Sequence, residues 1–195
     1  MTGRKLIMTF QVTGTSHRLA DYRARGGYGT LDKVLREMRP EQVTKEVAAS
    51  GILGHGGAAF PAGRKWGVIK LNDDQPHYLC ANADEGEPGT FKDRWILEHA
   101  PHLLIESMLI SAFALQVRHA FVYIRGEFDL PYRRLAAAVE EAYEAGLLGE
   151  SVMGSGFACD LVVYRGAGSY VCGEASALIT SIEGKKGYPR NRPPR

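Results

Sequence analysis

A run of acidic residues near the middle of the chain has the types and the spacing to do chemistry. Asp84, Glu85 and Glu87 lie within four residues, and carboxylates this close repel one another unless partners hold them. They could bind a metal, act as general acids or bases, or accept hydrogen bonds from the hydroxyl and ring N–H groups of a cofactor. A solvated acidic turn is the alternative. Because no histidine pair lies nearby, a catalytic metal is the weakest of these interpretations.

A glycine-rich loop precedes the acidic run. Six of the seventeen residues from Gly51 to Gly67 are glycine, and each glycine costs backbone entropy without bringing a side chain to pack. We therefore expect no core and no ordinary helix here, but a backbone that aims N–H groups at a flat or phosphorylated ligand. Lys65 could stabilise an anionic ring or be solvated, and Phe60 could be a stacking platform or a core anchor. The loop predicts a cofactor cradle.

A third segment of interest runs from Gly166 to Glu174. We expect it between a strand and a helix, where a helix N-terminus can hold a phosphate. Its third glycine falls at Gly173, so the segment lacks the G-x-G-x-x-G spacing and fits an ordinary dinucleotide site poorly. A tight turn without a ligand is the alternative.

The elements around these loops alternate between strands and helices. The pattern predicts strands at Tyr78–Asn82, His119–Ile124 and Cys159–Tyr164, and helices at Pro101–Val117, Pro131–Ala145 and Glu174–Ile182. Asp129 is positioned to cap the second of these helices. This order predicts an α/β, Rossmann-like, doubly wound parallel sheet with flanking helices. Ligands bind outside the carboxyl ends of such strands, so we expect all of these loops to converge on one edge.

The N-terminal part is expected to differ from the rest. Residues 1–20 show no period and predict an extended arm, followed by short helices at Thr30–Met38 and Pro40–Ala49, with Gly51 ending the second. We therefore divide the chain into an N-terminal arm with short helices, residues 1–50, and an α/β domain, residues 51–195.

Composition excludes several classes of partner. The net charge is +2 and basic residues are interspersed with acids, which argues against nucleic acid and anionic membrane surfaces. The apolar stretch Leu103–Val117 is interrupted by Glu106 and is too short to span a bilayer. The three cysteines show no C-x-x-C spacing, so we expect no metal or iron–sulfur site in this chain. With no signal peptide, the expected location is the cytoplasm.

Taken together, these stretches resemble one family: the NADH-binding flavoprotein subunit of respiratory complex I and its relatives in NAD-linked hydrogenases and formate dehydrogenases. The matching pieces cover most of the chain from residue 19 onward and occur in the family's order. They are Leu19–Leu35, Gly51–Trp66, Asn82–Arg94, Tyr123–Phe128 and Gly166–Pro194.

The resemblance implies an FMN held without a covalent bond, with NADH stacked on its exposed face and the flavin carrying the hydride chemistry. No side chain is then required as a catalytic acid or base. The implied FMN contacts are Gly54, Gly56, Gly57, Lys65, Asn82, Asp84, Glu85, Tyr170, Gly173 and Glu174. The implied nucleotide contacts are Phe60, Glu87 and the positions now occupied by Ala175 and Arg192.

The chain departs from the family's pattern mainly in the nucleotide half. Ala175 stands where the family usually has a second glutamate, which favours a free 2′-hydroxyl and repels a 2′-phosphate. Arg192 could pair with such a phosphate. We therefore expect NADPH to be accepted alongside or instead of NADH, with weaker adenine binding as the alternative. The other departures are His55, Ala59, Val68 and Arg195.

The resemblance also implies parts that this sequence does not contain. The family continues into a ubiquitin-like domain and a helical bundle that binds a 4Fe–4S cluster, whereas this sequence ends at Arg195. We expect electrons to pass singly to iron–sulfur subunits of a larger complex, which would place the chain peripherally on the inner face of a membrane. A structural or assembly subunit that has lost nucleotide binding is the alternative function.

Overall fold

A computed structural model of the chain describes residues 8–71 and 75–191. Its centre is a parallel sheet of β1 (Tyr78–Ala83), β2 (His119–Ile124) and β3 (Asp160–Arg165), in the order β1-β2-β3. The register aligns the three strand ends, because Asn82 lies opposite Tyr123 and Tyr123 lies opposite Tyr164. The expected α/β fold with a parallel sheet is confirmed, and the strand bounds differ from the predicted ones by one residue at most at each end.

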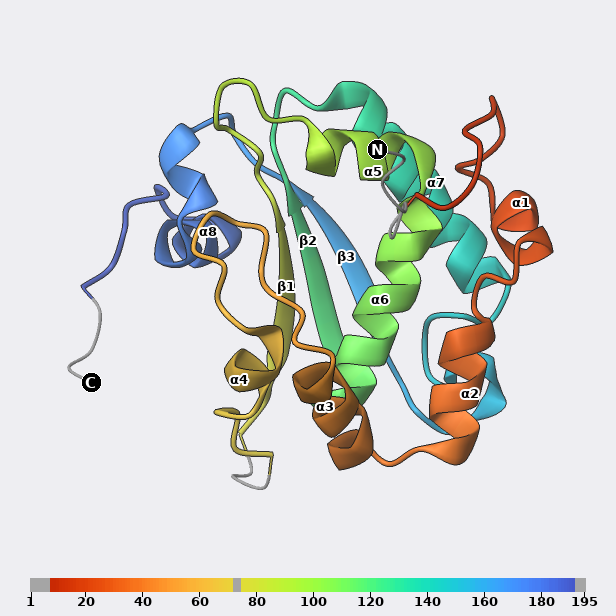
Figure 1. The fold of residues 1–195 in the computed structure, drawn as a ribbon. Helices are drawn as coiled ribbons and strands as arrows, with labels where there is room; N and C mark the ends of the chain where they lie inside the picture. Colours follow the sequence, from red (N-terminus) through yellow and green to blue (C-terminus); the bar gives the residue numbers. More distant parts are fainter. Residues whose placement is uncertain (1–7, 72–74, 192–195) are drawn as a thin grey trace, which may run out of the picture.

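Helices cover the two faces of this sheet differently (Figure 1). The connecting helices α6 (Pro101–Ala114) and α7 (Asp129–Glu144) pack on the face that carries Ala120, Val122 and Ile124. The opposite face carries Tyr123, which packs with Leu178 of α8 (Ala175–Ile182). All three residues of the first group and Tyr123 are at most 1% exposed, so β2 is buried on both sides, as its continuous apolar sequence predicts.

The N-terminal segment forms the helices α1 (Leu19–Ala24), α2 (Gly29–Glu37) and α3 (Pro40–Ala49). Helix α1 was not expected, because its polar six-residue sequence shows no clear period. Leu31 of α2 joins the main core together with Tyr22 and Tyr28. Gly51 follows α3 with a φ of +65°, the left-handed conformation expected after the end of a helix.

Glu106 holds this segment against the core. It is 6% exposed, although it lies in the apolar helix α6. Its carboxyl group accepts hydrogen bonds from the Tyr22 hydroxyl at 2.5 Å and from the backbone N–H groups of Tyr28 and Leu31 at 2.9 and 3.0 Å. The acid that interrupts the apolar stretch is therefore fully partnered, and it fixes the entry to α2.

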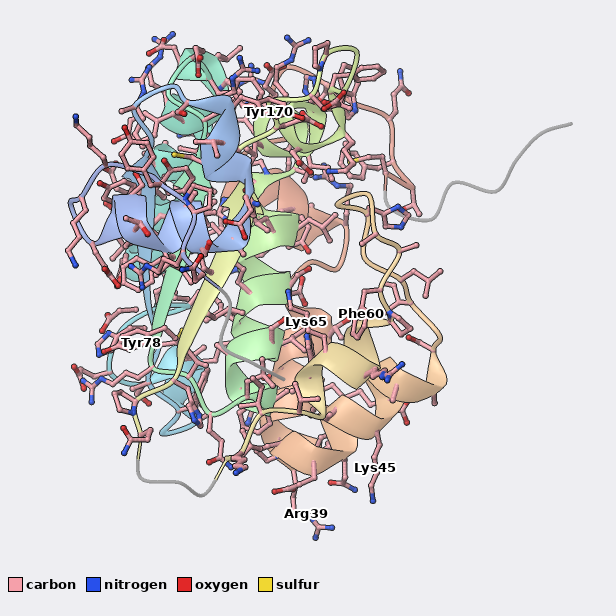
Figure 2. All side chains as sticks on the ribbon, turned by 90° about the vertical axis from the view of Figure 1, so that its left-hand side faces the viewer. Arg39, Lys45, Phe60, Lys65, Tyr78 and Tyr170 are labelled. Carbon is pink, nitrogen blue, oxygen red and sulfur yellow. The ribbon has the colours of Figure 1, made fainter. Side chains whose placement is uncertain are left out.

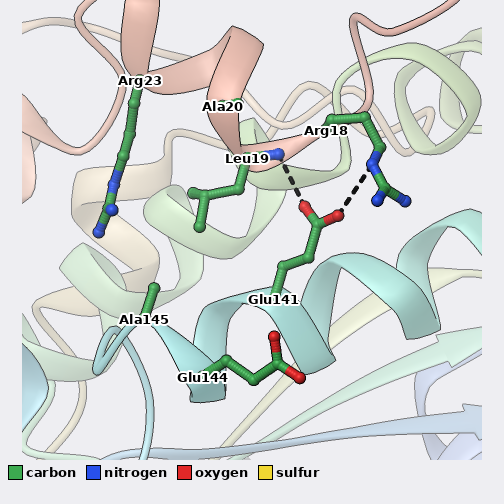
Figure 3. A pocket seen from close by; sticks show the side chains of 7 residues that line it. All are labelled: Arg18, Leu19, Ala20, Arg23, Glu141, Glu144 and Ala145. Carbon is green, nitrogen blue, oxygen red and sulfur yellow. Dashed lines mark hydrogen bonds and ion pairs between the residues drawn. The ribbon is translucent and has the colours of Figure 1, made fainter.

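A second polar contact joins the same segment to α7. Glu141 accepts a hydrogen bond from the Leu19 amide at 2.7 Å and pairs with Arg18 at 3.0 Å (Figure 3). His102 bridges the two networks, because its Nδ1 lies 2.9 Å from the Tyr28 hydroxyl and its Nε2 lies 3.1 Å from Glu141. A surface pocket opens beside this contact and is lined by Arg18, Leu19, Ala20, Arg23, Glu141, Glu144 and Ala145.

This network predicts a loss of stability on mild acidification. Burial lowers the pKa of His102 below its ordinary value, against the opposing hydrogen bond to Glu141. The unfolded chain therefore takes up more protons than the folded chain as pH falls through about 6.5, so stability is full above that pH and falls below it. We expect a lower Tm at pH 5.5 than at pH 7.5. The change His102→Gln, which removes the titration, should flatten this dependence in thermal unfolding followed by circular dichroism.

His55→Gln is the matched control, since His55 is exposed in the glycine-rich loop. Burial also lowers the pKa of His17 and His99, so His102→Gln should remove only part of the slope. An unchanged slope in His102→Gln would contradict the prediction.

Three further local features differ from the sequence-based expectation. Helix α4 (Ala62–Trp66) lies inside the glycine-rich loop, and helix α5 (Lys92–His99) lies in what was expected to be a polar loop. Helix α7 begins at Asp129 itself, and the Asp129 carboxylate pairs with Arg133 at 2.8 Å instead of capping the helix. Short 3-10 turns occur at η1 (Val152–Gly154) and η2 (Tyr170–Gly173).

Contacts with other parts of the chain explain why α4 and α5 form. Gly63 of α4 lies so close to α3 that an added Cβ would be 2.3 Å from the Ala48 Cα, so glycine here allows the two helices to touch. Glu85 caps α5, as described below. Among the described residues, no helix is long and apolar enough to cross a membrane.

Candidate functional site

The carboxyl end of β1 is joined to the loop that follows β3. Asn82 donates a hydrogen bond from its side chain to the Gly173 carbonyl at 2.8 Å and accepts one from the Asp84 amide at 3.1 Å. Gly173 also lies against Asp84, since an added Cβ would be 3.4 Å from the Asp84 carbonyl oxygen, an ordinary contact distance. Two of the segments expected at the sheet edge thus meet there.

One carboxyl oxygen of Asp84 is left unpartnered by the described residues. Its Oδ2 is buried and has no hydrogen-bond partner within the part of the chain that the structure describes. Burial raises the Asp84 pKa, and the Arg125 charge opposes this. Buried polar atoms in proteins are almost always partnered, so a donor from outside the chain is the natural complement of this atom.

The other two acids of the run point elsewhere. Glu85 is 8% exposed, and its two oxygens accept the backbone N–H groups of Asp93 and Arg94, each at 3.1 Å, in the first turn of α5. Glu87 accepts a hydrogen bond from the Tyr170 hydroxyl at 2.6 Å, which raises the Tyr170 pKa. The expected repulsion is therefore relieved by separate partners, and Glu85 is a helix cap in this structure.

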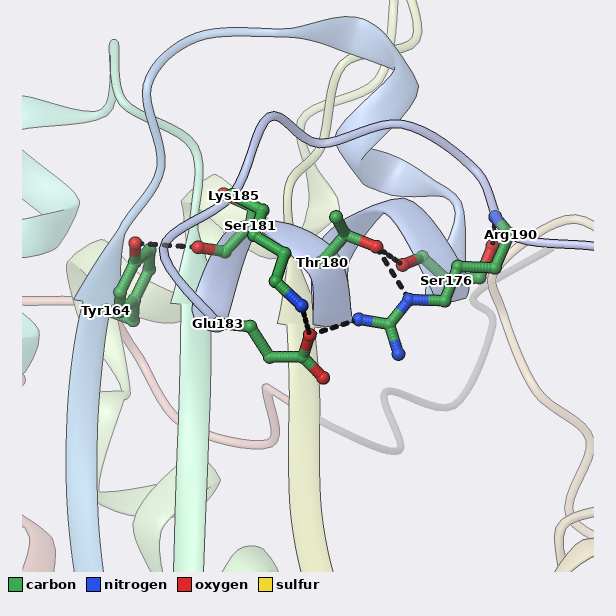
Figure 4. A network of polar contacts seen from close by, with 7 residues as sticks. All are labelled: Tyr164, Ser176, Thr180, Ser181, Glu183, Lys185 and Arg190. Atoms are coloured by element: carbon green, nitrogen blue, oxygen red, sulfur yellow. Dashed lines mark hydrogen bonds and ion pairs between the residues drawn. The ribbon is translucent and has the colours of Figure 1, made fainter.

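Glu174 also caps a helix. It precedes α8 and accepts the amides of Ser176 and Ala177, both at 2.9 Å. Beyond the helix, Arg190 donates from its amide to the Ser176 hydroxyl and from Nε to the Thr180 hydroxyl, each at 2.9 Å (Figure 4). Ala175 is exposed at the first position of α8, whereas Arg192 lies outside the described residues.

The glycine-rich loop forms a short hairpin. The Gly54 amide donates to the Phe60 carbonyl at 2.9 Å, and the Ala62 amide donates to the Ile52 carbonyl at 3.0 Å. At its tip the amides of Gly56 and Gly57 donate to no other described residue, and Gly57 has a φ of +102°. The tip therefore presents backbone N–H groups, as a cradle for an anion requires.

Phe60 and Lys65 belong to this hairpin and to α4 (Figure 2). Phe60 is 47% exposed, so it is available for stacking and does not anchor the core. Lys65 is exposed and forms no ion pair with any residue that the structure describes. Figure 2 shows both below Tyr170, which lies in the loop after β3. The expected convergence on one edge of the sheet holds for the loops that follow β1, β2 and β3.

Gly126, in the loop after β2, was not predicted as a site residue. An added Cβ on Gly126 would lie 2.4 Å from the Gly166 carbonyl oxygen and 3.1 Å from the Gly168 amide nitrogen. The loops after β2 and β3 can touch only because this residue has no side chain. The signal in the sequence is a glycine placed two residues after a predicted strand.

Comparison with known proteins identifies the family. The family model described as the Nuo51 FMN-binding domain matches residues 47–195. The chain belongs to this family. The match covers the whole of the predicted α/β domain, residues 51–195, and the boundary proposed at residue 51 stays a prediction. The resemblance found in the sequence is thereby confirmed, and with it the assignment of an FMN-binding domain.

Curated relatives of this Nuo51 FMN-binding domain belong to NADH-quinone oxidoreductases. One such protein of Rhizobium meliloti is 49% identical over 178 residues, which are 91% of this chain and 42% of that protein. Its counterpart in Escherichia coli is 46% identical over 177 residues, which are 90% of this chain and 40% of that protein. The chain therefore spans less than half the length of these relatives.

Solved structures agree with this assignment. A chain of an NAD+-reducing NiFe-hydrogenase in the H2-reduced state matches with a TM-score of 0.73 and 40% identity, over 83% of this chain and 27% of that chain. The air-oxidised form matches with a TM-score of 0.69. At this identity the comparison supports both the fold and the family.

The residues present fit FMN. The unpartnered Asp84 Oδ2 suits a hydroxyl or N–H donor, and the open amides of Gly56 and Gly57 suit an anionic group. Lys65 adds a positive charge without a competing partner among the described residues. No group of three His, Cys, Asp or Glu side chains within the described ranges is arranged to hold a metal ion.

Proposed function

We propose that this chain binds FMN between its glycine hairpin and the carboxyl edge of its sheet, and that a reduced nicotinamide nucleotide passes a hydride to that flavin. The observation that carries the proposal is the buried, unpartnered Asp84 Oδ2 at the meeting point of the strand-end loops. When bound, the flavin supplies the redox chemistry. The protein residues bind and orient it.

Each part of the site has a proposed role, taken from its contacts or, for Phe60 and Glu87, from the family resemblance. Asp84 and Asn82 accept from or donate to hydroxyl and ring groups, while Gly56, Gly57 and Lys65 hold negative charge and Gly54 closes the hairpin through its hydrogen bond to Phe60. Gly173 allows close approach of the backbone, and Glu85 and Glu174 fix the neighbouring helices α5 and α8 through their caps. Phe60 stacks with the nucleotide, and Glu87 with Tyr170 meets its nicotinamide end.

A titration tests the proposal directly. The purified chain without cofactor is mixed with FMN under anaerobic conditions, and bound flavin is measured by absorbance and by quenching of its fluorescence. We expect one FMN per chain and bleaching of the flavin by NADH or NADPH. A chain that binds no flavin would favour the alternative, a structural or assembly subunit.

We also propose that electrons leave the flavin singly to iron–sulfur subunits of a larger complex. The curated relatives carry the names of subunits of such oxidoreductases. The location that fits this assembly is the cytoplasm, with peripheral attachment to the inner face of a membrane through the complex. Copurifying chains identified from the native source would test this.

The choice of nucleotide depends on position 175. Ala175 is exposed beside Glu174 and carries no charge to repel a 2′-phosphate. We expect flavin reduction by NADPH as well as NADH. Ala175→Glu should raise the preference for NADH by about 10-fold, because the new carboxylate would repel the 2′-phosphate of NADPH. The ratio of the two kcat/KM values, measured anaerobically, checks both statements.

Ala175→Gln is the matched control, because it has the same length without the charge. A preference that shifts equally in both variants would show that size and not charge decides. Strong preference of the unchanged chain for NADH would contradict the expectation about NADPH.

A further inference from the structure

Arg125 connects two strand-end loops through its guanidinium group. It is the first residue after the central strand β2. Its Nη1 donates to the Glu85 carbonyl oxygen at 3.0 Å, and its Nε and Nη2 donate to the two carboxylate oxygens of Glu127 at 3.0 and 3.4 Å. The planar fork of arginine can make all three contacts at once, which lysine cannot.

Glu127 extends this connection to the loop after β3. Gly168 has a φ of +85°, and a Cβ added to it would be 3.2 Å from Glu127 Oε1. Arg165, the last residue of β3, donates from Nε to the Gly126 carbonyl at 3.0 Å. The segment Arg125–Glu127 therefore touches the loops after β1 and β3 from its position between them.

The contact at Glu85 determines how Asp84 is presented. Arg125 holds the carbonyl of Glu85, while α5 holds its carboxylate through two amides. The Gly86 amide closes a tight turn on the Asp84 carbonyl at 3.0 Å. With the next residue fixed on both sides, the backbone of Asp84 has little freedom. Its side chain therefore leaves the backbone from a defined position.

We propose that Arg125 is a positioning residue for the flavin site. Paired with Glu127, it holds together the loops that follow β1, β2 and β3 and sets the orientation of Asp84. This inference rests on the proposed function for its link to FMN. Arg125 also brings a positive charge close to the site, and such a charge favours electron uptake by a nearby flavin. It contacts the site residues, and no direct contact with the flavin is required.

The experiment compares Arg125→Met with Arg118→Met in the full chain. The two arginines flank β2, and each pairs with a glutamate, but the partner of Arg118 is Glu150 at the opposite end of the strand. Amide hydrogen exchange of residues 84–87 and 166–169 is measured without flavin. FMN affinity is measured by fluorescence quenching, and the flavin midpoint potential by spectroelectrochemistry.

We expect Arg125→Met to speed exchange in both loops, to weaken FMN binding by about 10-fold or more and to move the potential to more negative values. Arg118→Met should leave all three unchanged. Arg125→Lys keeps the charge without the fork, so it should retain the potential better than the affinity. If Arg125→Met does not fold, Arg125→Lys and Glu127→Gln still test the exchange and the affinity, and Glu127→Gln should move the potential to more positive values because it removes a negative charge.

The two proposals fail in different ways. Unchanged loop exchange, affinity and potential in the Arg125 variants would overturn the positioning role while leaving FMN binding intact. If the unchanged chain binds no FMN, the proposed function fails. If exchange is faster in the Arg125 variants alone, the result would still support the connection between the loops. An equal increase of exchange in Arg118→Met would overturn it.

Discussion

Glu106→Ala should lower the free energy of unfolding by about 3–4 kcal/mol, because three buried donors would lose their shared acceptor. The donors are the Tyr22 hydroxyl and the amides of Tyr28 and Leu31. Tyr28 has a φ of +65°, a conformation that side chains rarely adopt, so the hydrogen bond to its amide also holds a strained backbone. Nothing else in the described network accepts these amides.

Urea unfolding followed by circular dichroism measures this loss. Glu140→Ala is the matched control, since Glu140 is exposed on α7, and it should change stability by less than about 0.5 kcal/mol. We also expect Glu106→Ala to expose the N-terminal segment to limited proteolysis before the sheet unfolds. Equal stability of the two variants would show that the network contributes nothing.

Gly126→Ala should weaken FMN binding by about 10- to 100-fold, the range that overpacking of a tight contact produces. The added Cβ would meet the Gly166 carbonyl oxygen at 2.4 Å. This neighbour is backbone and not the flexible end of a side chain, so the two loops must move apart. Because Gly166 begins the loop that leads to Tyr170 and Gly173, the displacement reaches the flavin contacts proposed above.

Gly29→Ala is the matched control for this steric effect. Gly29 begins α2, and an added Cβ there meets nothing within 4 Å. Fluorescence quenching by both variants gives the two affinities, and thermal unfolding shows whether either has lost its fold. A Gly126→Ala chain that binds FMN as tightly as Gly29→Ala would refute the close contact between the loops.

The sheet could be predicted from sequence because its strands are short apolar runs at the expected spacing. Helices α1, α4 and α5 could not, since they depend on distant partners. The first turn of α5 is capped by Glu85, a residue of the preceding loop. Helix α4 needs the close contact of Gly63 with Ala48, which no local pattern reveals.

The site was predicted in part for the same reason. Glycines and acids at strand ends indicate a ligand edge in general terms, and the resemblance supplied individual residues. The direction of each carboxylate could not be predicted, because it depends on contacts such as that of Glu87 with Tyr170, which are 83 residues apart. Of the three neighbouring acids, only Asp84 has a buried oxygen without a partner among the described residues.

The anchoring of the N-terminal helices has a consequence for synthesis on the ribosome. The Leu19 amide and its acceptor Glu141 are separated by 122 residues. At roughly 5–20 residues per second, α1 waits on the order of 6–25 s before its partner has been translated. Until α6 with Glu106 has been translated, Tyr22, Tyr28 and Leu31 also have no core to join. The nascent chain is thus exposed to chaperones and proteases until α7 emerges, and its yield should depend on translation speed across this interval.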